Sequence, residues 1–211
     1  MSSGYSKRII YAAILFLFST GIVCAQSPNN ENLKGRHSIS FNAGIKMNSR
    51  SEVSGDIVML NMKSGFTGGI DYGYWFTGDW QMGININLVE ASMDLNYRNM
   101  KSHAVVSFLF GFKWYPESLK LGDAGRIFVG AYAGPVVGFG LREQGIPLVS
   151  ENITETVVGG QISAGADIFA ASWFRLGPAV NYNFMTDFKE ITDVNKNYSG
   201  VGFVFNFGFV L

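Results

Sequence analysis

Apolar and polar residues alternate with a period of two along most of this chain. The clearest example is the segment 201–211, in which an apolar side chain stands at every second position and Gly or Asn stands between most of them. This period is typical of β-strands whose two faces meet different surroundings, and no helical periodicity of useful length is present. The pattern predicts eight strands, within 38–47, 66–76, 80–88, 104–114, 126–141, 158–168, 174–184 and 201–211.

The connections between these predicted strands differ in length. Residues 77–79 and 170–172 form short connections, and 116–125 form an intermediate one. The other four connections are longer and cover 48–65, 89–103, 142–156 and 185–200. Short turns at one end and long loops at the other are typical of outer-membrane barrels with an even number of strands. We therefore predict an all-β fold, an eight-stranded antiparallel transmembrane β-barrel of up-and-down topology, with short periplasmic turns and longer extracellular loops.

The composition of the two strand faces indicates which of them meets lipid. One face carries mostly Phe, Ile and Val, and the other carries Gly, Asn and Ser with few charges. A soluble eight-stranded barrel of the lipocalin type would have to turn the second face towards water. Only 15% of the residues are charged, whereas a soluble surface usually needs roughly 25–35%. The prediction is that the large apolar residues face lipid and the small polar residues face the interior.

The tryptophans give an independent indication of the membrane boundary. All four lie beside the shorter connections of the predicted barrel, at Trp75, Trp80, Trp114 and Trp173. Trp prefers the level of the lipid headgroups, where an apolar ring meets a polar surface. We therefore predict that these four residues form an aromatic girdle on the periplasmic side.

Several charged residues fall on the predicted interior face. They are Arg36, Lys46, Asp71, Lys113, Arg126, Asp167 and Arg175, and all but Lys46 gather towards the tryptophan end. An eight-stranded barrel is just wide enough to be filled by side chains. We interpret the charges as a structural polar network that fills the interior, rather than as the lining of a conduit.

The N-terminal segment has the features of a secretory signal. Lys7 and Arg8 precede the apolar stretch 9–18, and small residues follow before Ala25. The stretch is too short for a spanning helix, and cleavage after Ala25 is predicted. Lipidation at Cys24 is the alternative. Residues 26–35 would then form a polar leader and 36–211 the barrel domain, exported to a bacterial outer membrane.

The composition excludes several functional classes. Lys and Arg together number 16, as do Asp and Glu, which excludes a strongly basic nucleic-acid binder. A single Cys excludes a disulfide scaffold or a multi-Cys zinc site. His37 and His103 are expected at opposite ends of the barrel and make no catalytic or metal-binding set. We therefore expect a non-enzymatic outer-membrane protein without cofactors or metals, which displays extracellular loops or docks a partner as an accessory to protein secretion or envelope assembly. The alternatives are a small-ligand transport barrel, which would need an apolar lumen, and a lipid-modifying enzyme.

The first long connection is unusually apolar at 57–62. Either it extends a hairpin above the membrane as a strand that pairs with a partner, or it packs over the mouth of the barrel.

A resemblance to a known group rests on four features: the signal end 23–26, the stretch 130–135, the triplet 165–167, and the alternating end 203–211. With these, the chain resembles the small outer-membrane barrels of the OmpX and OmpA type, and most of all the PorT-like outer membrane protein beta-barrel domain group. The resemblance implies contact with outer-membrane lipid, insertion by the machinery that reads the C-terminal strand, and an envelope or secretion protein as partner. Such families end in an aromatic residue, whereas this chain ends in Leu211, with Phe209 two residues earlier.

Overall fold

The computed structural model describes residues 33–54, 57–96, 99–144, 149–189 and 197–211. Side chains at 48–54, 57–64, 90–96, 99–103, 141–144 and 149–151 lie outside this description. The elements are β1 His37–Ser54, β2 Ile57–Trp75, β3 Trp80–Asn96, β4 Asn99–Trp114, η1 Glu117–Leu119, β5 Lys120–Leu121, β6 Gly125–Gln144, β7 Val149–Ala171, β8 Phe174–Met185 and β9 Gly200–Val210. Within these ranges no helix is both long and apolar enough to span a membrane.

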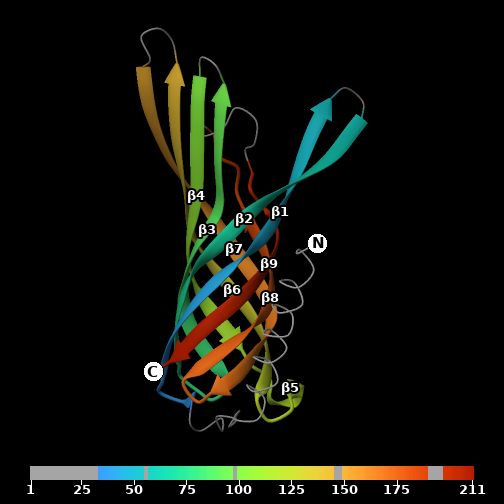
Figure 1. Ribbon diagram of the computed structural model, residues 1–211, viewed down its shortest axis with the longest axis vertical. Helices are drawn as coiled ribbons and strands as arrows, with labels where there is room; N and C mark the ends of the chain where they lie inside the picture. Colours follow the sequence, from blue (N-terminus) through green and yellow to red (C-terminus); the bar gives the residue numbers. More distant parts are fainter. Residues whose placement is uncertain (1–32, 55–56, 97–98, 145–148, 190–196) are drawn as a thin grey trace, which may run out of the picture.

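Eight long strands close into an antiparallel barrel (Figure 1). Each pairs with its neighbour in the chain, β4 pairs with β6, and β1 closes the ring against β9. The two-residue strand β5 adds a short pairing beside the start of β6. The predicted fold is confirmed, since the closed ring gives each of the eight long strands two neighbours, as a barrel in lipid requires.

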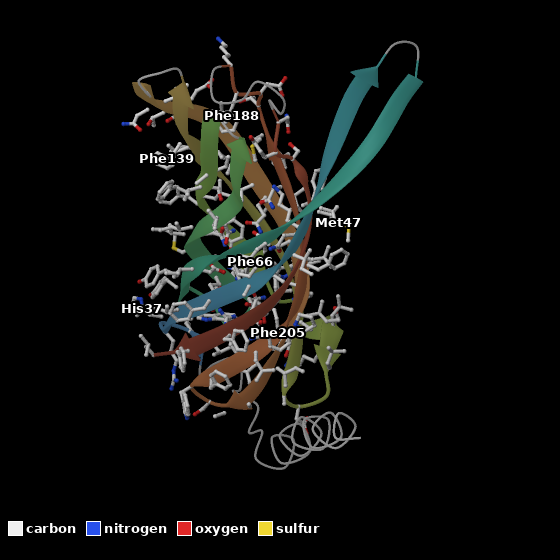
Figure 2. All side chains as sticks on the ribbon, turned by 45° about the horizontal axis from the view of Figure 1, so that its top comes forward. His37, Met47, Phe66, Phe139, Phe188 and Phe205 are labelled. Atoms are coloured by element: carbon white, nitrogen blue, oxygen red, sulfur yellow. The ribbon has the colours of Figure 1, made fainter. Side chains whose placement is uncertain are left out.

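The large apolar side chains point outwards. Phe66 is 67% exposed, Phe110 58% and Ile45 57%, whereas the adjacent Thr67, Leu109 and Lys46 are buried. Met47 and Phe139 project from the wall in the same way (Figure 2). A belt of exposed Phe and Ile on every strand is a surface for lipid and not for water.

The barrel has two different ends, which we name the turn end and the hairpin end. At the turn end the connections are 76–79, 115–124 and 172–173. At the hairpin end, β1 and β2 pair up to Ser54 and Ile57, and β6 and β7 pair up to Gln144 and Val149. The pairing of β2 with β3 stops earlier, at Gly68 and Leu88. The β1–β2 hairpin consequently diverges from the other strands (Figure 1).

These hairpins correct three of the predicted long loops. Most of 48–65, 89–103 and 142–156 continues the strands, so the apolar stretch 57–62 belongs to β2 and extends the hairpin. The alternation in sequence depends on a difference in polarity between the lipid and the barrel interior, and that difference ends at the membrane surface. Backbone pairing needs no such difference, so the ladder continues where the pattern fades.

A buried core closes the turn end. Leu33 is fully buried against aromatic and aliphatic side chains from both halves of the barrel. Gly35, with φ of 83°, turns the chain so that its backbone N–H donates to the Trp75 carbonyl oxygen at 2.7 Å. A positive φ favours glycine, because it has no Cβ. The predicted polar leader therefore needs correction: its last residues are part of the packed barrel. The predicted cleavage after Ala25 and the rest of the leader lie outside the described residues.

Trp75 does not belong to the outward girdle. Its side chain is fully buried inside the barrel, whereas Trp80, Trp114 and Trp173 are 41%, 44% and 57% exposed. Trp80 and Trp114 stack across β3 and β4 with ring centroids 5.9 Å apart. Trp75 has the same strand parity as Asp71 and Gly73, which places it on the interior face. Proximity to a short turn misled the prediction, because strand parity decides which way the ring points.

Both prolines within the strands interrupt a ladder. Pro135 of β6 and Pro178 of β8 are exposed on the outer face. The β4–β6 pairing omits the step at Pro135, and the β7–β8 pairing omits the step at Pro178. Proline has no N–H to donate, so the strand on that side loses a hydrogen bond at each position.

Leu33→Ala is expected to lower the free energy of unfolding by about 2–5 kcal/mol, because it leaves a cavity in the core at the turn end. The measurement is denaturant unfolding in lipid vesicles. Leu119→Ala is the control, since Leu119 is 47% exposed and its loss leaves no cavity. An unchanged midpoint for Leu33→Ala would show that this residue is not packed in the folded protein.

The position of Trp75 can be measured by quenching with brominated lipid. A variant with Trp75 as its only tryptophan is expected to lose little fluorescence in vesicles of brominated phospholipid, because the ring faces the interior. A variant that keeps only Trp173 should be strongly quenched. Equal quenching of the two would place Trp75 on the lipid-facing surface.

Candidate functional site

The interior near the turn end holds a buried ion pair with several partners. The Arg175 guanidinium lies 2.5 Å from the Asp167 carboxylate, and both side chains are less than 5% exposed. Tyr115 donates its hydroxyl hydrogen to Asp167 at 2.8 Å and lies 2.5 Å from Arg175. Arg175 also donates to the hydroxyl of Ser40 at 3.0 Å. Because the charges are matched and hydrogen-bonded, this group stabilises a closed interior rather than holding an open charge for a ligand.

Tyr115 contacts both the Arg175–Asp167 ion pair and Arg126. It follows β4, and burial raises the pKa of its phenol well above the ordinary value. The phenol therefore stays protonated and remains a donor to Asp167. Its ring packs on Trp75 with centroids 4.5 Å apart, and the Arg126 guanidinium lies 5.2 Å from the ring centroid.

Arg126 fastens the first short turn to the barrel. It donates to the Asp79 carboxylate at 2.8 Å and to the Gly78 carbonyl oxygen at 2.9 Å. It also donates to the Tyr115 carbonyl oxygen at 3.3 Å and lies 5.6 Å from the Trp75 ring. A single buried cation thus holds the 76–79 turn against the connection that follows β4.

The middle of the barrel is a polar layer. Lys113 and Asp71 form a buried ion pair, and the Lys113 ammonium lies 5.2 Å from the ring centroid of Phe128. Asn87 donates to Asn85 and to Gln161, the latter at 3.2 Å. The space left among these side chains is about 20 Å³, which is room for roughly one water molecule. Side chains therefore fill most of the space around this cavity.

The hairpin end is closed by an apolar cluster. Phe188 and Tyr198, which follow β8 and precede β9, are fully buried on it. Figure 2 shows Phe188 at the opposite end of the barrel from His37. Below them the cluster is formed by Val89, Val105, Val136, Val157 and Met185. Lys46 donates to the Tyr198 carbonyl oxygen, which ties the segment before β9 to β1.

The structure places the predicted interior residues in separate groups. Arg126, Asp167 and Arg175 meet around Tyr115, whereas Lys113 and Asp71 pair one layer further in. Lys46 is buried at the other end. Arg36 precedes β1 and is only half-buried, so it stands at the rim rather than in the network.

The interior contains more apolar side chains than predicted. An apolar and aromatic cluster lies at each end, the turn end also holds the charged network around Tyr115, and Asn, Gln and Ser line the middle. Sequence reasoning missed Tyr115, which lies outside any alternating run. Phe128 and Tyr132 share the strand parity of Arg126 in β6, and both are buried on the interior face.

The two histidines do not form a site. His37, at the start of β1, contacts Tyr72 through Nδ1 at 2.6 Å on the exposed outer surface. His103 lies on β4 and pairs with Ser92 towards the hairpin end, and its side chain is outside the described residues. Among the described residues there is no cluster of His, Cys, Asp and Glu able to hold a metal.

Comparison with known proteins supports the architecture. No protein-family model matches this chain, and neither does any curated protein. Among solved structures, neisserial surface protein A has a TM-score of 0.50 and 14% identity, covering 84% of this chain and 97% of that chain. Ail, the attachment invasion locus protein of Yersinia pestis, has a TM-score of 0.48 and 12% identity over 84% and 99% of the two chains. Outer membrane protein OprG of Pseudomonas aeruginosa has a TM-score of 0.48 and 12% identity over 84% and 97%. At these identities the likeness shows the fold alone, that of small outer-membrane β-barrels.

Arg175→Leu is expected to lower the free energy of unfolding by about 3–5 kcal/mol, because it leaves the Asp167 carboxylate buried without its cation. The double variant Asp167→Leu/Arg175→Leu should recover much of this loss. Denaturant unfolding in vesicles measures both.

The control for this pair is Lys120→Ala. It removes the exposed pair of Lys120 with Glu117 and should change stability by less than about 1 kcal/mol. A single Arg175 variant as stable as this control would contradict the stabilising role of the network.

Proposed function

We propose that this protein is a non-enzymatic integral protein of a bacterial outer membrane that docks a partner protein through its extracellular hairpins. The turn end would then face the periplasm and the hairpin end the outside. The closed antiparallel fold and the exposed apolar belt support the membrane location. Export by the signal segment that ends at Ala25 and insertion through the C-terminal strand complete this proposal.

The interior of the barrel is packed with side chains, which leaves the hairpins as candidates for function. Packed clusters lie at both ends of the barrel, and the cavity among the central polar side chains has room for about one water molecule. A conduit would need a continuous passage through these three layers. The exposed surfaces outside the membrane are therefore the better candidates for function.

The observation that carries the proposal is the free edge of β2. Beyond Gly68, β2 continues to Ile57 with β1 as its partner on one side, and no described strand pairs with it on the other. Across the same seam, β3 continues from Leu88 to Asn96 with β4 as its only described partner. Unpaired N–H and C=O groups on such edges are a template for an added strand.

The sequence of this edge favours a protein partner. Residues 57–60 and Met62 are apolar, which is unusual for a segment that extends past the membrane. An exposed apolar strand edge promotes association unless another strand covers it. A partner strand would satisfy the backbone groups and cover these side chains together. A role as accessory component in protein secretion or envelope assembly, as in the PorT-like group, is consistent with such docking.

The test is affinity purification of the protein from its native outer membrane after crosslinking, with identification by mass spectrometry. A stoichiometric partner crosslinked within 57–62 is expected. Replacing 51–60 by an Asn-Gly turn between the paired residues Arg50 and Asn61 should abolish its capture, while the barrel still folds.

The matched control shortens the other hairpin. It replaces 93–102 by the same turn between the paired residues Ser92 and His103, and should retain most of the captured partner. Recovery of the wild-type protein as a monomer without partner would overturn the docking proposal. Passage of small solutes through vesicles containing the protein would show instead that it is a conduit.

A further inference from the structure

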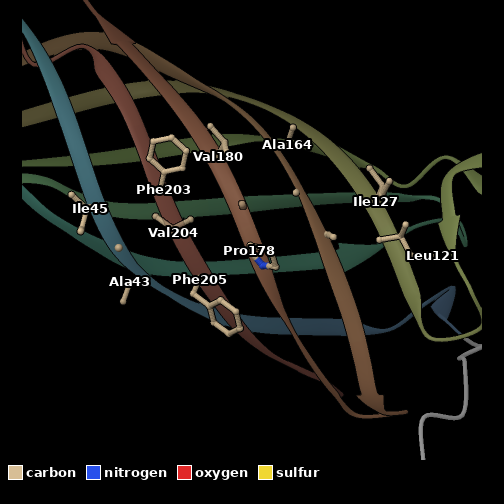
Figure 3. A pocket seen from close by; sticks show the side chains of 14 residues that line it. Ala43, Ile45, Leu121, Ile127, Ala164, Pro178, Val180, Phe203, Val204 and Phe205 are labelled. Carbon is tan, nitrogen blue, oxygen red and sulfur yellow. The ribbon is translucent and has the colours of Figure 1, made fainter. Parts of the chain in front are cut away.

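The outer wall of the barrel carries a groove of about 680 Å³ at the β7–β8–β9–β1 side (Figure 3). Its floor consists of the small residues Ala43, Ala164, Ala166 and Pro178 together with strand backbone. Larger side chains border it: Ile45, Leu121, Ile127, Val180, Phe203 and Phe205. Elsewhere the lipid-facing belt carries mainly large residues, so the small ones create a local depression.

Strands β7 and β8 approach closely beside the groove. A Cβ on Gly177 would collide with the carbonyl oxygen of Ala166 on the neighbouring strand. The β7–β8 pairing skips the step at Pro178, which has no N–H to donate.

The depth of the groove assigns it to one leaflet. Pro178 and Val180 lie four and six residues beyond the start of β8, at the turn end. A strand tilted by about 40° advances roughly 2.5 Å per residue along the barrel axis, which places them about 10–15 Å above the turn end. Half of the hydrocarbon core is also about 15 Å thick. Leu121 and Ile127 continue the groove towards the turn end, so it spans the leaflet at that end.

The lining indicates the chemistry of the occupant. All fourteen lining residues are apolar or glycine. The groove is continuous with the lipid-facing belt, so an occupant enters it from the bilayer. An unfilled hollow would forfeit dispersion contacts along its floor. Its volume falls within the range of roughly 300–1,000 Å³ typical of ligand sites.

A second copy of the chain fits this surface poorly. A two-fold dimer would place the same concave face opposite itself and leave the hollow open between the copies. A flexible acyl chain, in contrast, can follow a narrow apolar depression. We propose that the groove holds an acyl chain of one phospholipid from the leaflet at the turn end, as an ordered lipid that stays on the protein.

The charges beside the groove predict little selection of the headgroup. Lys120 adjoins Leu121 at the rim, where Glu117 and Asp123 are also exposed. One cation and two anions give no net attraction for an anionic headgroup. Binding should therefore depend on the acyl chain of the lipid and not on its headgroup.

The test is photocrosslinking in phosphatidylethanolamine vesicles that contain a trace of phosphatidylcholine with a diazirine midway along one acyl chain. Labelling is expected to be at least fivefold higher on 164–166 and 178–180 than on 84–86, an ordinary part of the belt. Ala164→Phe, which fills the groove, should reduce labelling of 178–180 at least fivefold. Ala43→Leu provides a second filling variant should the first fail to fold.

The matched control is Ala133→Phe, which adds the same bulk at an exposed position of β6 outside the groove. It should leave labelling of 178–180 unchanged, and the migration of unheated samples on gels verifies folding of each variant. Uniform labelling around the belt, or no loss in the filling variants, would overturn the proposal. Crosslinks between two copies at the groove would overturn it in favour of a dimer. None of these outcomes depends on whether the hairpins dock a partner.

Discussion

Closure of the sheet is the constraint on which the rest of this structure depends. Lipid offers no hydrogen-bond partner, so a strand that crosses it must be paired on both sides, and the first strand must meet the last. Closing eight strands leaves an interior only as wide as side chains can fill. The composition of the inner face follows from this limit: Gly, Ser and Asn where the walls approach, and a few large or charged residues that reach across.

The charged side chains inside the barrel therefore fill its narrow interior and form ion pairs and hydrogen bonds there. Arg175 and Arg126 reach inwards from two strands and converge on Tyr115, which no strand contains. The aromatic ring of Trp75 lies beside both of these cations. Arg175, Arg126 and Lys113 each have a carboxylate partner, and their side chains also fill the interior. The surfaces left for recognition are the outer wall and the strand edges beyond the membrane.

Much of this architecture was predictable from the sequence, because every long strand alternates between apolar lipid-facing residues and small or polar interior residues. Lipid on one side and a narrow interior on the other impose alternation, and alternation predicts both the strands and their faces. Trp75 was assigned to the outer surface because it lies beside a short turn, whereas its position in the strand alternation places it on the interior face. Leu33 gave no signal, since one apolar residue in a polar segment has no period. The hairpins beyond the membrane were read as loops because the contrast that marks strands ends there.

The packing of Leu33 has a consequence for the order in which the barrel is completed. This residue shares its cluster with Val204 and Val210 of β9, so the described chain's first and last segments meet in one core. A growing chain that lacks β9 has neither its closing seam nor the far wall of that cluster. Partly assembled forms consequently gain little from docking the N-terminal segment early. The final strand therefore completes both the closing seam with β1 and the cluster around Leu33.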